Sequence, residues 1–299
     1  MRRWVIFLLL AFLLIFVLLI GILWRFTSKE EILAGEVIGL IQVNGILAQQ
    51  KGGFGGVTSS DDIVSLLEDA GKNPRYKGVV LRINSPGGTI SAAQEVYTAI
   101  KRFRLKGKPI VASMGDVAAS GGYYIATACD EIFANPGTLT GSIGTILEIY
   151  SFEGLFEKLG IQAFTFKEGK FKDIGNWSRR VSREEEVLLQ RMATRAYQQF
   201  FQAVLEGRKG KITEEQLKEI ADGRPILGEE ALEYHLIDAL GTLEDAIDRA
   251  GALAGIKGKP EVHELKPRFR WWELLTPETE GWGKLMYLHF YPKIYWMEK

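Results

Sequence analysis

Four apolar segments alternate with amphipathic segments between residues 37 and 134, and this alternation limits the folds open to the chain. Each apolar segment has the length and composition of a buried strand, and each amphipathic segment carries apolar residues at helical spacing. Strands separated by helices pair in parallel, because the helix returns the chain to the edge of the sheet at which the strand began. The sequence therefore predicts an α/β fold with a parallel sheet flanked by helices. The predicted strands are 37–43, 78–83, 109–114 and 130–134.

The rest of the chain is predicted to be mainly helical. Ser182 and Glu185 have the spacing of a capping box, and apolar residues repeat at helical spacing from there to about residue 206. One further strand is predicted at 162–167, before a turn at Glu168 and Gly169. Shorter helices are predicted at 91–104, 155–159, 213–221, 228–235 and 243–252.

Residues 4–24 form an uninterrupted apolar run, which as a helix spans roughly 30 Å, the thickness of a bilayer core. Tryptophans at both ends are typical of membrane interfaces, and Arg2 and Arg3 place the N-terminus on the cytoplasmic side. A cleaved secretory signal is the alternative, but the run is longer than such signals and no Ala-x-Ala site follows it. We therefore expect an anchor at 1–26, a linker at 27–36, and a single-pass cell-membrane protein whose main domain is extracytoplasmic.

The composition argues against several classes of site. The 37 basic and 37 acidic side chains balance, and no basic run indicates nucleic-acid binding. Cys129 is the single cysteine, so it cannot form an intrachain disulfide and is expected in the core. The three histidines are widely spaced and lack partners at ligand spacing, so we expect no metal and no cofactor.

Ser120 lies at the centre of a stretch of small residues, 115–126, where a predicted strand meets a predicted helix. The flanking alanines and glycines leave room for a second segment of chain, and the free N–H groups of a first helical turn bind developing negative charge. A nucleophile would suit this position. The alternative is a helix N-cap, for which serine is a favoured residue.

A serine nucleophile needs a base, and no histidine lies in a catalytic motif, so lysine is the remaining candidate. The segment 167–173 offers Lys167, Lys170 and Lys172. A lysine works as a base only when burial lowers its pKa from ~10.4 to roughly 7 to 8, and Phe171 offers apolar surroundings. The alternative is three solvated lysines on a strand or loop.

The oxyanion formed when serine attacks a carbonyl needs fixed donors, usually two backbone N–H groups. Residues 84–88 end a predicted strand just before a helix, so Gly88 is placed to offer one donor and Gly121 the other. An ordinary strand-to-helix turn is the alternative.

Several motifs follow one another in order between about residues 37 and 250: NSPGG at 84–88, MGDVAASGGYY at 114–124, TLTGSIG at 138–144, KD at 172–173, DGR at 222–224 and LID at 236–238. Together they resemble the signal peptide peptidase SppA family, in its short form with a single catalytic domain. The resemblance implies a ClpP/crotonase-like α/β fold over residues 37–255, followed by a tail at 256–299. It also implies a Ser-Lys dyad protease that degrades residual signal peptides in or near the membrane.

The resemblance assigns a role to each matching residue. It implies that Ser120 is the nucleophile and Lys172 the general base, that Ser142 orients the lysine, and that Gly88 and Gly121 donate to the oxyanion. In the short form it implies a homo-oligomer in which the serine and the lysine of a dyad come from different subunits. The expected partners are signal peptides or membrane-derived peptides as substrates, and membrane lipid.

Three alternatives to this function are weighed. One is a protease of similar fold that cuts other membrane proteins, such as the stomatin-partner proteases that share an Ala-Ser-Gly-Gly motif. Another is a non-catalytic, membrane-tethered scaffold that binds peptides. A crotonase-type acyl-CoA enzyme is disfavoured, since an extracytoplasmic domain would lack CoA.

The tail after Pro267 is rich in aromatic residues, which suit a bilayer interface, a hydrophobic groove or a subunit contact. We predict that its end, 293–299, lies in a substrate groove of its own or a neighbouring chain. The motivation is its extended apolar and aromatic character beside a free carboxylate, which resembles a bound product.

Overall fold

The computed structural model describes Trp4, residues 12–18, Gly21, residues 35–49 and 56–267, and the backbone of residues 295–297. The chain divides into two compact units, Met1–Glu36 and Val37–Lys299. In the first unit, residues 12–18 are helical. No helix within the described ranges is long and apolar enough to cross a membrane. Most of the predicted membrane segment 4–24 lies outside these ranges, so the anchor, the linker and the membrane location stay predictions.

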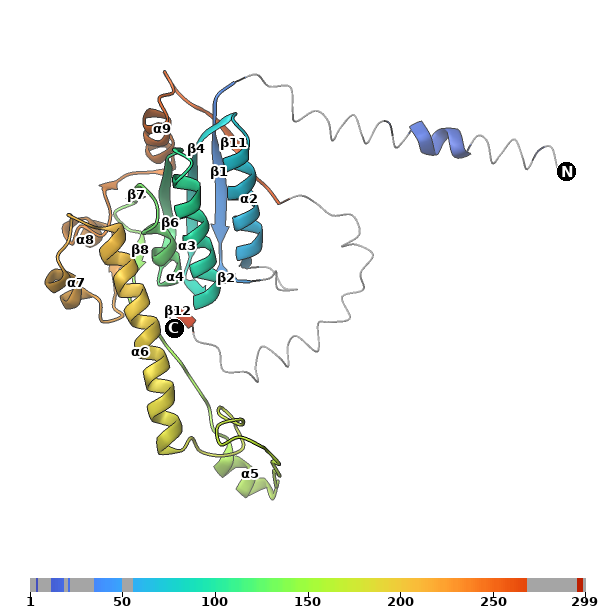
Figure 1. Cartoon of the computed structure of the whole chain (residues 1–299), viewed down its shortest axis with the longest axis vertical. Helices are drawn as coiled ribbons and strands as arrows, with labels where there is room; N and C mark the ends of the chain where they lie inside the picture. The colour runs from blue at the N-terminus through green and yellow to red at the C-terminus, as the bar shows by residue number, and fades with distance from the viewer. Residues whose placement is uncertain are drawn as a thin grey trace. The chain divides into compact units, whose positions relative to one another are not determined.

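The second unit is built on a mainly parallel sheet, as the β-α alternation predicts (Figure 1). Its strands follow the order β10-β7-β6-β4-β1-β11, and every neighbouring pair in this order is parallel. Strand β8 pairs with β6 in parallel and with β9 in antiparallel orientation. The bounds are β1 (Val37–Asn44), β4 (Tyr76–Ser85), β6 (Ile110–Ala119), β7 (Glu131–Ala134), β8 (Leu139–Gly141), β9 (Pro225–Leu227), β10 (Ala239–Leu240) and β11 (Glu261–Glu264). Strand β11 lies after residue 255, the predicted end of the catalytic domain, so the sheet includes the start of the predicted tail.

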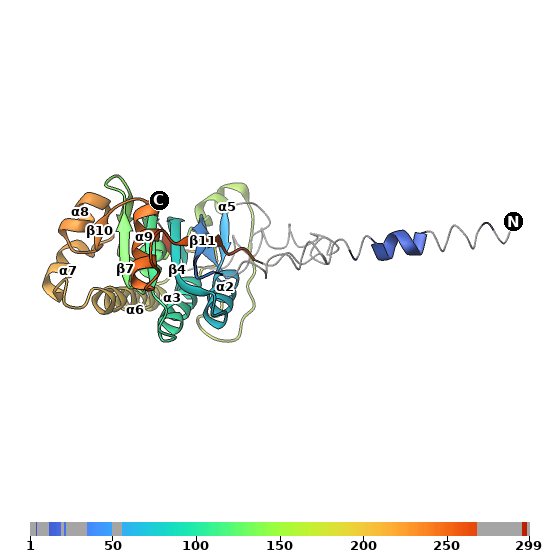
Figure 2. The same ribbon diagram turned by 90° about the horizontal axis from the view of Figure 1, so that it is seen from above.

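Helices cover both faces of this sheet (Figure 2). Leu81 of β4 packs in one core with helices of the first face, whereas its neighbour Val80 packs in a second core with Ala246 of α9. The two cores follow from the pleat, since successive side chains of a strand point to opposite faces. The helices of the first face are α2 (Ser60–Lys72), α3 (Ile90–Arg104), α4 (Gly121–Ala126) and α6 (Arg183–Gly207), and the second face carries α9 (Leu243–Leu253).

A small second sheet lies at the end of β4 and has the strand order β12-β5-β2-β3. Strand β5 is parallel to β2 and antiparallel to β12. The strands are β2 (Ile46–Ala48), β3 (Val57–Ser59), β5 (Gly87–Thr89) and β12 (Tyr295–Met297).

Residues 144–184, here called the arm, leave the body of the unit and return at the start of α6 (Figure 1). The arm contains α5 (Glu153–Leu159), and none of its residues is buried. The strand predicted at 162–167 is wrong. These residues have no regular structure and are all exposed, including Phe164 and Phe166. The segment has the composition of a strand but gains no partner to pair with, and an unpaired strand is not stable.

The C-terminal end of α6 is fixed by a buried ion pair. Arg208, of which 2% is exposed, donates to Asp238 at 2.8 Å and to the carbonyl groups of His235 and Ile237. Asp238 also accepts a hydrogen bond from the backbone N–H of Ile132 in β7. The pair therefore joins α6 to the edge of the sheet, beside α7 (Glu214–Ile220) and α8 (Gly228–Glu233).

Candidate active site

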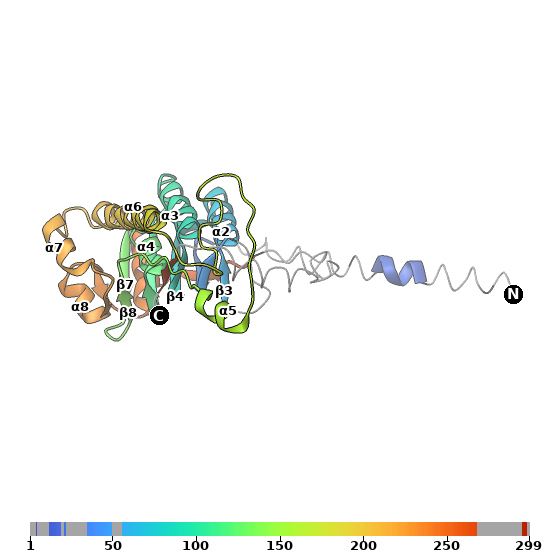
Figure 3. The same cartoon turned by 90° about the horizontal axis from the view of Figure 1, so that it is seen from below.

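Ser120 lies where the sequence predicts, between the last residue of β6 and the first residue of α4. Its backbone N–H donates to the carbonyl of Gly141 in β8 at 2.9 Å, and its carbonyl accepts from Tyr124 N–H at 2.8 Å. Helix α4 in turn packs between the sheet and the helices α3 and α6 (Figure 3). Ser120 is thus held from three sides, and 1% of it is exposed.

The backbone of Ser120 is strained and its hydroxyl makes no capping bond. Its φ is 52° and its ψ is −119°, a region that residues other than glycine avoid because occupying it costs about 1–3 kcal/mol. At the same position on α2 and α6, Ser59 and Ser182 do accept the capping hydrogen bond from the helix backbone. The N-cap alternative for Ser120 therefore fails on the structure. A hydroxyl held in a strained turn and not used by its own helix is available for chemistry.

The small residues after Ser120 are required by a close approach of residues 85–88, at the end of β4 and the start of β5. A Cβ atom on Gly121 would lie 3.2 Å from both Gly87 Cα and Gly88 N, and one on Gly122 would lie 2.7 Å from Ser85 O. A Cβ atom on Gly88 would lie 1.9 Å from Leu47 O in β2. The predicted oxyanion donors Gly88 and Gly121 are therefore neighbours in space, as the sequence predicts.

Ser142 is brought next to Ser120 by the pairing of β8 with β6. The last pair in register is Ala119 with Gly141, and each serine follows directly. Ser142 also has a positive φ, 51°, and is buried. Its N–H donates to the carbonyl of Arg224 at 2.9 Å. The sequence motif at 222–224 contains Arg224, but no role was predicted for it; in the structure its carbonyl holds the backbone of Ser142.

The side chain of Lys172 is not part of this cluster. Lys172 lies in a turn of the arm, its N–H donates to Gly169 O at 3.1 Å, and it is exposed. Figure 1 shows the arm beyond the start of α6, whereas α4 lies in the body of the unit. The burial beside Phe171 that sequence reasoning invoked is absent, because Phe171 is itself exposed. Within the described residues of one copy, Ser120 thus lies near Ser142 and the two glycines that are the predicted oxyanion donors, whereas Lys172 lies apart on the arm.

The other two candidate lysines have acidic partners in the arm. Lys167 forms an ion pair with Asp173, and Lys170 forms one with Glu184. No ion pair of Lys172 is found within residues 56–267. Among the three, Lys172 is thus the amine left without a competing carboxylate.

The arm is itself held to α6 by a charged network. Arg179 donates to Asp173 at 2.9 Å and to Glu185, the third residue of α6, at 2.6 Å. These bonds from Arg179 lower the pKa of Glu185 to about 2 and, together with Lys167, hold the pKa of Asp173 well below its usual range. The predicted capping box of Ser182 with Glu185 is confirmed, so the same carboxylate also caps the helix.

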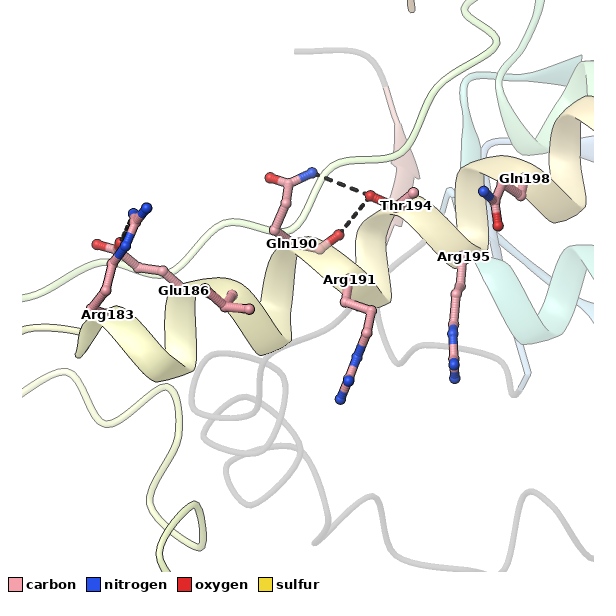
Figure 4. A pocket seen from close by; sticks show the side chains of 8 residues that line it. Arg183, Glu186, Gln190, Arg191, Thr194, Arg195 and Gln198 are labelled. Atoms are coloured by element: carbon pink, nitrogen blue, oxygen red, sulfur yellow. Dashed lines mark hydrogen bonds and ion pairs between the residues drawn. The ribbon is translucent and has the colours of Figure 1, made fainter.

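A cavity of about 760 Å³ lies on the outer side of α6 but has no catalytic character (Figure 4). Its lining comes from α6 alone, with Arg191 and Arg195 extending from the helix and the Thr194 hydroxyl bonded to Gln190 O at 2.9 Å. A hydroxyl that donates to its own helix is not a poised nucleophile. The strained serine at α4 therefore remains the candidate site.

Two models of known protein families match the part of the chain that contains Ser120. The model of "Peptidase family S49" matches residues 102–257, and that of "Clp protease" matches residues 56–138. A putative protease of Synechocystis sp. is 46% identical over 191 residues, which are 64% of this chain and 67% of the relative. The putative signal peptide peptidase SppA of Enterococcus faecium is 35% identical and is aligned over 74% of this chain and 64% of its own length. Protease 4 of Salmonella typhi is 36% identical over 78% of this chain, which spans 37% of that longer protein.

Among solved structures, a mutant of the membrane-bound stomatin-specific protease 1510-N shares the fold. The TM-score is 0.52 at 16% identity, and the match covers 79% of this chain and all of that one. At this identity the likeness concerns the fold alone. The sequence expectation of an α/β fold with a ClpP-like domain is confirmed.

Proposed function

The chain belongs to peptidase family S49 and is a serine endopeptidase, and from this premise we propose that it is a membrane-anchored enzyme that degrades residual signal peptides. Ser120 is the nucleophile and Lys172 the general base. The observation that carries this proposal is the geometry of Ser120, a buried serine in a strained turn whose hydroxyl makes no capping bond, followed by Gly121 in close approach to Gly88. The apolar run at 4–24 supports the anchor, with the N-terminus cytoplasmic and the catalytic domain outside.

The reaction follows from these positions. The Ser120 oxygen attacks the scissile carbonyl while neutral Lys172 takes the hydroxyl proton. The N–H groups of Gly88 and Gly121 stabilise the oxyanion, and the lysine then passes its proton to the leaving amine. Water activated by Lys172 hydrolyses the acyl-enzyme and restores the serine. Ser142 holds the amine of the incoming lysine in this proposal, which is supported by its burial beside Ser120.

The lysine comes from a second copy of the chain in this proposal. In one copy Lys172 is exposed on the arm, so it lacks the dry surroundings that a neutral amine needs. The arm has an apolar surface that a partner would cover: its exposed side chains include Leu155, Phe164 and Phe166. Monomers rarely expose so many large apolar side chains together, and such surfaces mark subunit contacts. Docking of the arm would bury both this surface and the amine.

Labelling and turnover test the nucleophile and the base. A fluorophosphonate should acylate Ser120 in the wild-type chain, and Ser120→Ala and Lys172→Ala should each abolish cleavage of a signal-peptide substrate. Lys170→Ala is the matched control, because Lys170 lies on the same segment but is bound to Glu184. Full cleavage rates in the Ser120→Ala or Lys172→Ala proteins would end the proposal.

Co-expression of the two inactive variants tests the shared dyad. In a random mixture, about a quarter of the sites pair an intact serine with an intact lysine from the neighbour, so about a quarter of the activity should return. A dyad formed within one chain predicts no recovery. The mass of the assembly, measured on the same samples, shows whether the two variants have mixed.

A further inference from the structure

Residues 101–108, here called the basic turn, lead from the last turn of α3 to β6 and concentrate positive charge. Their sequence, Lys-Arg-Phe-Arg-Leu-Lys-Gly-Lys, contains five cations and no acidic residue. The balance of 37 basic and 37 acidic side chains over the whole chain hides this local excess. Lys101 and Arg104 form ion pairs with carboxylates of other segments. The cations of the turn for which residues 35–49 and 56–267 supply no ion pair are Arg102, Lys106 and Lys108.

The basic turn presents a leucine to solvent from a fixed backbone. Leu105 is 87% exposed, although Phe103, two residues before it, is buried. The N–H groups of Leu105 and of the next residue donate back to carbonyls of α3 at 3.1 and 3.0 Å. The amine of Lys108 fastens the turn to the end of α2, where it donates to two carbonyls at 2.9 and 2.7 Å. An exposed leucine held between two cations has the composition with which proteins enter a lipid interface.

The cations of the turn are close enough to act on one another. Burial, and after it the charges of Lys106 and Lys77, lower the pKa of Lys108. Lys108 points its amine at carbonyls of the chain itself, whereas Arg102 and Lys106 are exposed. An anionic partner in contact with this exposed pair would relieve the repulsion between like charges.

The basic turn lies at the edge of the sheet where the chain enters the second unit. Strands β1, β4 and β6 are parallel neighbours, so their first residues share one edge, which is at the upper end of the unit in Figure 1. About 10 Å, two strand spacings, separates the start of β1 from the start of β6. The predicted linker 27–36 leads directly into β1, and its ten residues reach at most about 35 Å. The proposed anchor therefore tethers this edge, and not the edge at Ser120, close to the bilayer.

An anionic lipid surface is the partner that fits both the charge and the position. Each cation near such a surface strengthens binding about fivefold, and a leucine among the cations adds apolar area at the boundary between headgroups and acyl chains. An acidic protein would match the charge of the turn. It would not explain why the charge lies at the edge to which the linker attaches.

We propose that the basic turn docks on anionic phospholipid headgroups, with Arg102 and Lys106 against the phosphates and Leu105 in the apolar boundary beneath them. This inference rests on the proposed function, because it takes the anchor at 1–26 as its tether. Ser120 follows the ten residues of β6, so it lies about 30 Å from the docked edge. A substrate segment must therefore leave the bilayer to reach the serine.

A fluorophore at residue 105 reports the docking in the full chain held in nanodiscs. Bimane coupled to Leu105→Cys keeps an apolar group at this position, and the native Cys129 is buried and should not react. Quenching of the label by acrylamide, which is uncharged, should be about tenfold weaker in discs that contain phosphatidylglycerol than in discs of phosphatidylcholine alone. This is the effect expected if the turn is docked for about nine tenths of the time. The same label on Gly137→Cys, beyond the carboxyl end of β7, is the control and should be quenched equally in both lipids.

A double substitution tests the charge. Arg102→Gln with Lys106→Gln should weaken docking about 25-fold, about fivefold for each cation, so quenching of the label at 105 should return nearly to its value in phosphatidylcholine. Both side chains are exposed and unpaired, so the fold should be unchanged. Arg191→Gln with Arg195→Gln removes the same charge from the exposed face of α6 shown in Figure 4 and should leave the quenching as it was.

The results that would overturn the inference differ from those that would overturn the anchor. A chain that stays with the discs while its label at 105 is quenched equally in both lipids refutes the docking and leaves the anchor standing. A chain that separates from the discs refutes the anchor and the docking together. Protection of the label that follows the number of chains per disc and not the lipid charge assigns the turn to a contact between copies, and it also refutes the docking.

Discussion

Ser120 and Ser142 follow the last register pair of strands β6 and β8, and both hold backbone conformations that non-glycine residues avoid, with φ values of 52° and 51°. The two strained residues are locked together, because the N–H of Ser120 donates to Gly141 O, the group directly before Ser142. Strain of this kind persists where the surrounding structure fixes it and is concentrated at functional sites. The two serines are thus held in fixed positions beside each other.

Replacement of Ser120 should separate catalysis from stability. Both Ser120→Ala and Ser120→Gly remove the nucleophile and should lower activity by at least about 10³-fold. Glycine adopts a positive φ at no steric cost. The free energy of unfolding of the Ser120→Gly protein should therefore be about 1 kcal/mol larger than that of the Ser120→Ala protein. Chemical denaturation of the two variants measures the difference. Equal stability would show that the strained conformation is absent in solution.

Replacement of Ser142 should impair turnover without removing the nucleophile. Loss of one hydrogen bond to the catalytic amine costs about 1.5–3 kcal/mol, so Ser142→Ala should lower kcat/KM about ten- to a hundredfold. Ser142→Gly should lose the same activity but relieve the strain of the positive φ, and so be the more stable of the two. Steady-state kinetics and denaturation check both statements, and a Ser142→Ala enzyme with normal kcat/KM would exclude the orienting role.

Gly88 should not tolerate a methyl group. A Cβ atom there would lie 1.9 Å from Leu47 O, and backbone cannot yield as a flexible side chain can. We expect Gly88→Ala to destabilise the fold by about 2 kcal/mol or more and to abolish activity, since overpacking forces the backbone apart. Gly137→Ala is the control, because its Cβ would meet no atom within 4 Å. Thermal unfolding of both variants measures the loss of stability, and a Gly88→Ala protein as stable as Gly137→Ala would contradict the prediction.

The ion pair of Arg208 with Asp238 should be the most costly one to break among the described residues. Both partners are largely buried, and hydrogen bonds from Arg208 and Lys211 keep the pKa of Asp238 below its usual value although burial alone would raise it. Asp238→Asn leaves the buried guanidinium without its counter-ion, so we expect a loss of about 3–5 kcal/mol. The exposed pair of Lys218 with Glu214 is the comparison, and Glu214→Gln should lower the stability far less, because solvent screens an exposed ion pair.

Acid should loosen the arm. The pKa of Glu185 is lowered by Arg179 from 4.5 to about 2, so its bond stabilises the folded state fully above pH 4.5 and is lost as the pH falls through 2. The pKa of Asp173 is lowered in the same direction, so the two carboxylates act together. Hydrogen exchange in residues 150–182, corrected for the intrinsic effect of pH, should rise over this range. Arg179→Gln should raise exchange at neutral pH and remove most of the pH dependence, and a variant as protected as the wild type would contradict the network.

The four strands of the β-α alternation, the junction that holds Ser120 and the capping box at Ser182 could all be predicted from the sequence, because each depends on residues within a few positions of one another. The family motifs also marked Gly88, Gly121 and Ser142. Their meeting in space was beyond local reasoning, since it depends on the register of β6 with β8 and on the approach of β5 to α4.

The surroundings of two other segments were decided by tertiary structure alone. Residues 162–167 have the composition of a strand yet form none, because a strand is stable only with a partner. Lys172 adjoins an apolar residue in sequence but lies exposed on the arm, since burial depends on what packs against a side chain and not on its neighbours along the chain. The sequence by itself thus predicted the candidate site residues from local patterns and family motifs, and the tertiary structure decided that the two serines and the two glycines meet within one copy while Lys172 lies apart on the arm.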